Sequence, residues 1–235
     1  MNILKSIDVV VLCGGKGERL QSVLGEKPKV LVEVSGRPFL SILIDNFRKF
    51  GFNRFILSVG YRRDKIIDYF KDRADIFFSQ EEIALGTGGG LKKAESLVKS
   101  SSFLVVNGDS FCDLDFNRLF SFHREKRAIL TMALVRTTKV KDYGTVTIDS
   151  TGKIKSFQEK VEGLNFCLAN AGIYLMDKEI FKQMPQKKVF SLERDLFPKT
   201  ENSFGFVTEA KLYDIGTPER YVQAKEFFNC KGAMS

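Results

Sequence analysis

The feature that most constrains the fold of this chain is an alternation of short apolar runs with amphipathic helical patterns through its first half. The apolar runs are typical of buried strands and cover residues 8–13, 55–59, 75–79 and 102–106. The helical patterns between them cover residues 39–50, 65–70 and 88–98. This order predicts a parallel sheet with right-handed crossovers. Ligands then bind beyond the carboxyl ends of the strands.

The second half has a different pattern, in which short strands are joined by tight turns. These strands are predicted at residues 129–135, 144–148, 154–158 and 172–176. Residues 149–152 favour a hairpin turn, and residues 218–228 favour a closing helix. We therefore expect one domain over residues 1–235, with a Rossmann-like, three-layer α/β fold and a mixed, mainly parallel sheet. Residues 1–125 or so form its first half, and residues from about 126 to 235 form its second.

Composition excludes several classes of function. Of the 235 residues 43% are hydrophobic, yet no apolar run approaches the ~20 residues of a membrane span. We expect a cytoplasmic protein with no signal peptide and no membrane association. The single histidine, His123, lies in a charged stretch and is predicted at the surface. This scarcity argues against histidine chemistry and against a zinc site, and Cys13 and Cys167 are predicted to be core thiols.

The formal net charge of +8 is spread along the whole chain. A basic surface keeps a protein soluble, and it also attracts polyanionic substrates. We expect no nucleic-acid partner, because the chain has no zinc-finger spacing, aromatic RNA-binding motif or basic arm.

A glycine-rich loop, Gly14-Gly15-Lys16-Gly17-Glu18-Arg19-Leu20, directly follows the first predicted strand. Glycines let backbone N–H groups close around phosphate oxygens, and the two basic side chains favour an anion over a simple tight turn. The loop is not a Walker A sequence, because no Gly-Lys-Ser/Thr closes it. Lys29 follows Pro28 a little further on. It is either part of a surface turn or a second cation for the same phosphates.

Two aspartates belong to motifs that are far apart in the chain. Asp109 ends Asn-Gly-Asp after the strand at residues 102–106, and Asp214 opens Asp-Ile-Gly-Thr-Pro. Magnesium prefers a few carboxylates together with phosphates and water, so each aspartate is a candidate metal ligand. Each aspartate also has a structural interpretation, as a helix cap for Asp109 and as a turn residue for Asp214. Glu159 and Lys160 are equally typical of an exposed charge pair.

In this order the motifs resemble those of the sugar 1-phosphate nucleotidylyltransferase family. The glycine-rich loop and the Pro-Lys-x-Leu that follows it are similar to the family's amino-terminal signature. The resemblance then continues in order through nearly the whole chain, with Leu85-Gly86-Thr87-Gly88-Gly89, Asn107-Gly108-Asp109, Tyr143-Gly144, Glu159-Lys160, Asn170-Ala171-Gly172-Ile173-Tyr174 and Asp214-Ile215-Gly216-Thr217-Pro218.

The resemblance implies Mg²⁺-dependent transfer of a nucleotidyl group from a nucleoside triphosphate to a sugar 1-phosphate, with release of pyrophosphate. It implies catalytic roles for Arg19, Lys29 and Asp109 and metal binding by Asp109 and Asp214. The nucleotide-binding candidates are Leu12, Gly14, Gly15, Lys16, Gly17, Gln80, Gly86, Thr87 and Gly88. The candidates for the sugar phosphate are Gly144, Glu159, Lys160, Asn170 and Gly172.

The short length, with no carboxy-terminal β-helix, and residues 190–198 resemble the subgroup of D-glycero-D-manno-heptose 1-phosphate guanylyltransferases. This implies GTP and a manno-configured heptose 1-phosphate as substrates. The chain departs from the family at Val30 and Val161, where relatives often have proline, but neither change removes a catalytic group. Uridylyl, cytidylyl or thymidylyl transfer to a hexose or aminosugar 1-phosphate stays open, as does a non-catalytic regulatory subunit that binds a nucleotide sugar. We expect a monomer or a homodimer.

Overall fold

The computed structural model describes residues 3–138, 143–159 and 166–232. The strands are β1 (Asp8–Leu12), β2 (Glu33–Val34), β3 (Arg37–Pro38), β4 (Phe55–Val59), β5 (Ile76–Gln80), β6 (Ser102–Asn107), β7 (Ser110–Cys112), β8 (Leu130–Thr137), β9 (Gly144–Ile148), β10 (Ile154–Glu159), β11 (Cys167–Asp177), β12 (Ser203–Thr208) and β13 (Leu212–Asp214). The α-helices are α1 (Gln21–Leu24), α2 (Phe39–Phe50), α3 (Arg63–Phe70), α4 (Gly86–Ala94), α5 (Phe116–Lys126), α6 (Ile180–Gln183) and α7 (Pro218–Gly232).

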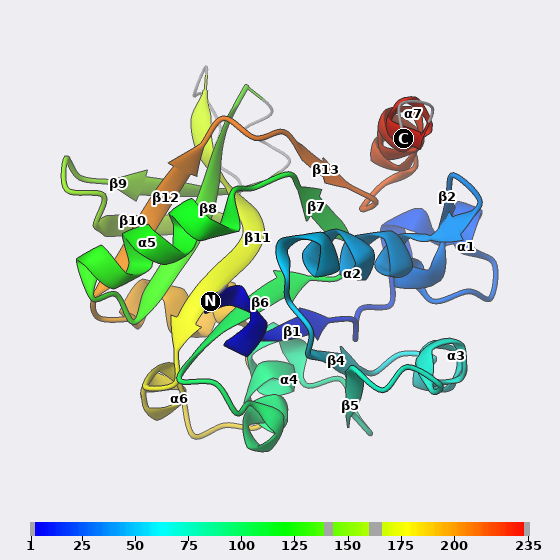
Figure 1. The fold of residues 1–235 in the computed structure, drawn as a ribbon, viewed down its shortest axis with the longest axis horizontal. Coiled ribbons are helices and arrows are strands. Elements are labelled where there is room, and N and C mark those ends of the chain that lie inside the picture. The colour runs from blue at the N-terminus through cyan, green and yellow to red at the C-terminus, as the bar shows by residue number, and fades with distance from the viewer. Residues whose placement is uncertain (1–2, 139–142, 160–165, 233–235) are drawn as a thin grey trace.

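The first half contains the predicted parallel strands. β1 lies between β4 and β6, and β4 pairs with β5, all in parallel register. In Figure 1 these strands run through the lower centre of the molecule, with α2 in front of them. Their carboxyl ends therefore lie at one edge of the sheet, as the alternation of strands and helices predicts.

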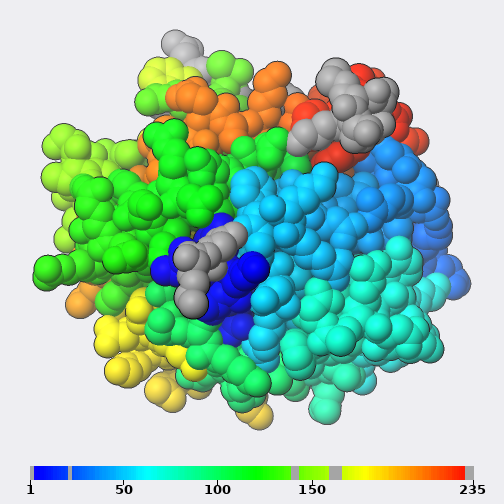
Figure 2. Space-filling view, in the orientation of Figure 1, coloured from blue at the N-terminus to red at the C-terminus, as the bar shows by residue number. Residues whose placement is uncertain are grey.

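The second half continues the same sheet with antiparallel strands. β11 pairs with β6 and also with β8 and β9, and β12 returns parallel to β8. The mixed sheet predicted from the sequence is thus confirmed, with the order β10-β9-β11-β6-β1-β4-β5 along its main path. Because β6 pairs directly with β11, the two halves share one sheet. Figure 2 shows them as a continuous surface, with η1 (Ile3–Ser6, blue) between the cyan and green regions.

Apolar side chains cover both faces of the sheet. Val9 and Val11 of β1 belong to one core cluster, together with α2, whereas Val10 belongs to the other, together with α4. This alternation follows from the period of two in a strand. α2 is amphipathic and ends at Gly51 in the left-handed conformation (φ 105°), which stops the helix. Burying a side chain such as Leu43 or Phe47 contributes about 1.5–3 kcal/mol.

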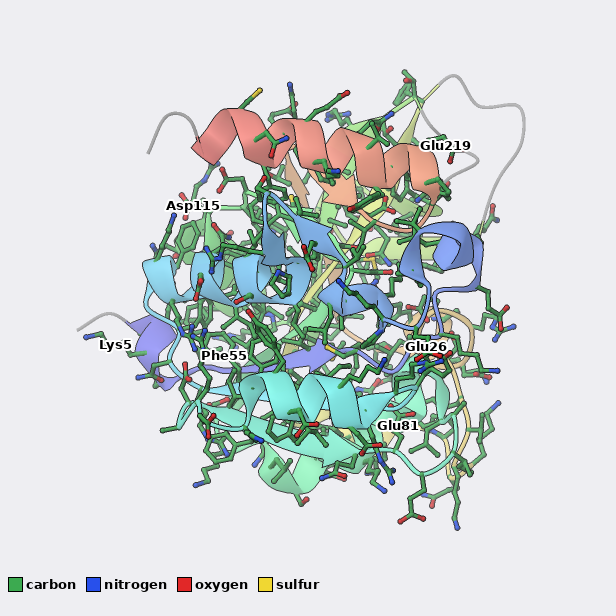
Figure 3. The ribbon with its side chains drawn as sticks, turned by 90° about the vertical axis from the view of Figure 1, so that its right-hand side faces the viewer. Lys5, Glu26, Phe55, Glu81, Asp115 and Glu219 are labelled. Carbon is green, nitrogen blue, oxygen red and sulfur yellow. The ribbon has the colours of Figure 1, made fainter. Side chains whose placement is uncertain are left out.

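One prediction from the sequence was wrong in this region. His123 is buried, with 4% of its surface exposed, because it lies on the inner face of α5 and hydrogen-bonds through Nδ1 to Thr131 Oγ1 at 2.8 Å. α5 itself begins at the cap Asp115 (labelled in Figure 3), whose carboxylate accepts a hydrogen bond from Arg118 N at 3.1 Å. Burial lowers the pKa of His123 to about 4, so the ring is neutral at physiological pH. Cys13 and Cys167 are buried as predicted. Among the described residues, no helix has the length and apolar character needed to span a bilayer.

Candidate active site

Two adjoining pockets open at the carboxyl edge of the parallel strands. The glycine-loop pocket, of about 700 Å³, is lined by residues 12–19 together with Lys29, Val30, Ser58, Glu81, Ala84, Gly86, Thr87, Asn107, Asp109 and Gly216. The carboxylate pocket, of about 440 Å³, is lined by Arg19, Asn107, Asp109, Ser110, Tyr143, Gly144, Phe157, Asn170, Gly172, Glu193, Leu212, Asp214, Gly216 and Arg220. Arg19, Asn107, Asp109 and Gly216 line both pockets. Chemistry between two ligands would take place at this shared wall.

The glycine-rich loop forms one side of the glycine-loop pocket. Gly17 has φ 69°, a left-handed conformation that glycine adopts without strain, and its carbonyl accepts a hydrogen bond from Leu20 N at 2.9 Å. Leu20 is fully buried and anchors the end of the loop. The side chains of Lys16 and Arg19 are exposed beside the pocket. The loop thus presents backbone groups and two cations to an anionic ligand.

Lys29 reaches the same region from the short helix η3 (Lys29–Leu31). Its side chain is only 10% exposed, and its Nζ donates a short hydrogen bond to Asp109 Oδ2. Burial acts to raise the pKa of Asp109, but the charge and hydrogen bond of Lys29 outweigh it and hold that pKa below its ordinary value. Asp109 is therefore ionised at neutral pH and available to a cation.

Glu81 is a residue of this pocket that the sequence analysis missed. It is 7% exposed and follows β5, and its oxygens accept hydrogen bonds from Ser58 Oγ at 3.2 Å and from Leu85 N at 3.0 Å. Within the described residues it makes no ion pair. The candidate Gln80 is exposed and does not line the pocket, because alternation along β5 turns it to the other face. That alternation is the signal that could have identified residue 81. Figure 3 labels Glu81 at the same side of the molecule as Glu26.

The first turn of α4 meets a segment from far along the chain. Gly86 and Thr87 line the glycine-loop pocket, whereas Gly88 lies beneath the ring of Phe190, where a Cβ atom would approach the ring to 2.3 Å. The amides of Gly88 and Gly89 donate to the carbonyl of Phe190 at 3.0 and 3.2 Å. Gly88 is thus a packing residue in this structure and does not line the pocket.

Asp214 is held by several donors in the carboxylate pocket. Gly216 N donates to its Oδ1 at 2.7 Å, Tyr143 Oη donates to its Oδ2 at 2.9 Å, and Arg220 Nη1 lies 3.0 Å from both oxygens. Arg220 was not singled out in the sequence, because its partner lies six residues earlier in a turn whose shape the sequence does not specify.

Sheet pairing brings the two aspartates together. β13 pairs with β7 so that Asp214 lies opposite Ser110, and Ile215 N donates to the carbonyl of Asp109 at 3.0 Å. The two carboxylates offer oxygen ligands in one pocket. Within the described residues, no group of three or more acidic, histidine or cysteine side chains is positioned to hold a metal ion. This donor set fits Mg²⁺, which takes one or two carboxylates and completes its shell with phosphate and water. Burial, followed by the charges of Asp109 and Glu81, raises the pKa of Cys13, so its thiol is no competing ligand.

The other candidates lie around the carboxylate pocket. Gly144, Asn170 and Gly172 line it, and Asn170 Oδ1 accepts a hydrogen bond from Gly172 N at 2.9 Å. Asn170 Nδ2 donates to the buried hydroxyl of Tyr174 at 2.7 Å. Glu159 lies opposite Gly144 in the β9–β10 pair, which brings its backbone to this region. Lys160 lies outside the described residues.

Several known proteins are similar in sequence to this chain over most of its length. The family model described as nucleotidyl transferase matches residues 8–230. The chain is 34% identical to the D-glycero-alpha-D-manno-heptose 1-phosphate guanylyltransferase of Aneurinibacillus thermoaerophilus, over 94% of this chain and 97% of that protein. It is also 34% identical to the protein of the same name from Campylobacter jejuni, over 92% of this chain and 97% of that protein.

Among solved structures, HddC from Yersinia pseudotuberculosis complexed with GMP-PN superposes with a TM-score of 0.85. The two sequences are 37% identical, and the match covers 94% of this chain and 99% of the HddC chain. The family match spans residues 8–230, a range that contains the glycine-rich loop, both aspartates and the mixed sheet. The chain therefore belongs to the nucleotidyl transferase family.

Proposed function

We propose that this chain transfers a guanylyl group from GTP to a manno-configured heptose 1-phosphate, forming a nucleotide sugar and pyrophosphate. The observation that carries the choice of base is Glu81, a buried carboxylate without a cationic partner in the glycine-loop pocket. The similarity to heptose 1-phosphate guanylyltransferases over almost the whole chain supports the choice of acceptor.

The chemistry of the bases explains why a carboxylate favours guanine. Guanine presents two adjacent N–H donors on its Watson–Crick edge, and an ionised carboxylate has two oxygens that can only accept. Uracil and thymine present one N–H between two carbonyl oxygens, which a carboxylate repels. Adenine and cytosine each present an acceptor beside their amino group. A buried polar group left without its partner is costly, so Glu81 would discriminate strongly between these bases.

The cations of the loop are suited to the triphosphate. Arg19, with its fork of donors, would stabilise the departing pyrophosphate, while Lys16 and the amides of Gly14–Gly17 bind the phosphate chain. Lys29 would turn from Asp109 to the α-phosphate. Asp109 and Asp214 would hold Mg²⁺, which supplies charge neutralisation when bound. Alignment and neutralisation are the main requirements, because the attacking group and the phosphate it attacks are both anions.

The acceptor would occupy the carboxylate pocket. An oxygen of its phosphate attacks the α-phosphorus of GTP, and the bond to pyrophosphate breaks, with pyrophosphate leaving with the electron pair. Gly144, Asn170 and Gly172 would line the sugar, Glu159 would accept hydrogen bonds from sugar hydroxyls, and Lys160 would contact the sugar phosphate. Arg19 and Asp109, which line both pockets, would lie at the point of transfer.

A matrix of the four common nucleoside triphosphates against several sugar 1-phosphates, read by pyrophosphate release, tests the proposal. We expect GTP with the manno-heptose 1-phosphate to give the highest kcat/KM. A value for another triphosphate ten times that for GTP contradicts guanylyl transfer and leaves the family unchanged. No turnover with any pair would instead favour a regulatory subunit that binds without catalysis.

A further inference from the structure

The segment at residues 190–198 forms part of the active site, although the reaction described above assigns it no role. Phe190 accepts hydrogen bonds from the first turn of α4, which contains Thr87, and the π-helix η6 (Leu192–Leu196) follows. Leu192 N donates to Thr87 Oγ1 at 2.9 Å. This packing brings Glu193 against Thr87 at the junction of the two pockets, although the two residues are 106 positions apart in the chain.

Glu193 is held firmly through one of its two carboxylate oxygens. Thr87 Oγ1 donates to its Oε2 at 2.8 Å, and Ser191 Oγ donates to the same atom at 2.7 Å. Among the residues that the structure describes, nothing donates a hydrogen bond to Oε1, and the carboxylate pairs with no cation. Glu193 is half-buried, lines the carboxylate pocket and lies close enough to the buried Tyr174 to contribute, after burial, to raising the pKa of that phenol.

An oriented carboxylate with an unused oxygen has a clear chemical preference. It repels phosphate, and it suits a neutral ligand that carries hydroxyl donors. The cations of the carboxylate pocket, Arg19 and Arg220, lie near Gly216 and Asp214, on a different segment from Glu193. A sugar phosphate would thus direct its phosphate toward the point of transfer, where Arg19 and Asp109 line both pockets, and its hydroxyls toward Glu193.

We propose that Glu193 is a specificity-determining residue for the acceptor, whose carboxylate accepts a hydrogen bond from a sugar hydroxyl while Thr87 and Ser191 hold it in place. This inference rests on the proposed function, because it requires a sugar phosphate in the carboxylate pocket. It adds a second carboxylate to Glu159 in acceptor recognition and gives residues 190–198 a role there.

The first test compares Glu193→Gln with the wild-type enzyme. Glutamine keeps the size of the side chain and can still accept from Thr87 through its carbonyl oxygen, but its second group is then a donor. We expect kcat/KM for the sugar 1-phosphate to fall about ten- to a hundred-fold, chiefly through KM, as expected when a charged hydrogen bond is lost. The KM for GTP should stay within twofold. Arg194→Gln is the matched control, because Arg194 is the exposed neighbour on the same helix, and it should behave as wild type.

The second test identifies the hydroxyl. With a series of monodeoxy sugar 1-phosphates, the wild type should lose most with one analogue, and Glu193→Gln should lose little further with that same analogue. Equal losses in both enzymes for every analogue overturn the inference, and so does an unchanged KM of Glu193→Gln for the sugar. In either case GTP-dependent turnover by the wild type still upholds the proposed function.

Calorimetric GTP binding by Glu193→Gln separates recognition from folding. We expect a Kd within twofold of wild type. A variant that binds GTP much more weakly would show that Glu193 has a structural role in holding the first turn of α4 at Thr87. That result overturns the inference. Absence of turnover by the wild type with every pair overturns the proposed function itself.

Discussion

The two pockets differ in how the chain builds them. The glycine-loop pocket is lined mainly by residues that directly follow parallel strands, such as Gly14 after β1, Glu81 after β5 and Asp109 after β6. The carboxylate pocket depends on pairing between distant segments, such as β7 with β13 and β6 with β11. In a parallel sheet every residue that follows a strand reaches the same edge. The first pocket is therefore specified by local sequence, and the second by long-range register.

The acidic residues of the two pockets also fall into two kinds. Asp109 and Asp214 each pair with a cation, Lys29 and Arg220 respectively. Glu81 and Glu193 make no ion pair within the described part of the chain, and each is oriented by hydroxyl or amide donors. Paired carboxylates suit a site that exchanges one cation for another when phosphates bind, whereas unpaired ones suit neutral N–H and O–H donors. Each pocket thus contains an unpaired carboxylate suited to recognition, and Asp109 lies where the pockets meet.

Removal of divalent metal should have the largest effect, because Asp109, one of the two proposed metal ligands, lines both pockets. We expect excess EDTA to abolish turnover with every substrate pair, and added Mg²⁺ or Mn²⁺ to restore it, since the pair of oxygen ligands has no softer ligand beside it. The measurement is pyrophosphate release. Undiminished turnover in EDTA would show that Asp109 and Asp214 have another role.

Arg19→Ala should lower kcat about 10²-fold or more, because Arg19 lines both pockets and would stabilise charge that develops on the leaving pyrophosphate. Its side chain is exposed, so the fold should survive and the melting temperature should change little. Lys27→Ala is the control, since Lys27 forms only an exposed pair with Glu33. A folded Arg19→Ala enzyme with near-normal kcat would mean that Arg19 has no catalytic role.

Glu81→Gln should act on the glycine-loop pocket alone. An amide offers one acceptor and one donor, which no longer matches the two N–H groups of guanine and instead matches the imide edge of uracil. We expect kcat/KM for GTP to fall about ten- to a hundred-fold and the ratio of GTP to UTP use to fall further, with the KM for the sugar nearly unchanged. Glu82→Gln, at the exposed neighbour, is the control. A uniform loss with all four triphosphates would argue that Glu81 only supports the loop through Leu85.

The contrast between the pockets explains what the sequence could and could not predict. The parallel strands, the glycine-rich loop, Lys29 and Asp109 follow from local patterns, and the structure brings Lys29 and Asp109 into contact. The predicted base contact Gln80 does not line the pocket, whereas Glu81 does. Which of two neighbouring side chains faces the pocket becomes clear only once the buried face of β5 is known. The contacts of Arg220 and Glu193 depend on β13 and on the π-helix, and neither has a local signature.

The helix α5 and the strand β12 were also not predicted. In α5 the apolar side chains Phe116, Leu119 and Phe120 recur at helical spacing, a local signal that the prediction missed, and this face packs on β8 and β12. His123 continues the same spacing, so the helical period buries it although its neighbours are charged. The register of β12 with β8, in contrast, depends on pairing between distant segments.

Glu159→Gln is the smallest of the expected effects and the sharpest test of the division between the pockets. The change keeps the size of the side chain but removes its charge and one acceptor. If Glu159 accepts hydrogen bonds from sugar hydroxyls, the loss of about 1.5–3 kcal/mol should appear as a kcat/KM for the sugar 1-phosphate that is about ten- to a hundred-fold lower. The KM for GTP should change by less than twofold.

Asp109→Asn provides the contrast that makes this result decisive. Because Asp109 lines both pockets, this substitution should lower kcat with every substrate. An exposed ion pair with Lys160 is the competing interpretation of Glu159, and it predicts almost no change, since exposed pairs contribute little. A Glu159→Gln enzyme with a raised KM for GTP and an unchanged KM for the sugar would reverse the assignment. Glu159, which pairs with Gly144 across β9 and β10, would then belong to the nucleotide side of the site. Steady-state kinetics with each substrate varied in turn distinguishes these three outcomes.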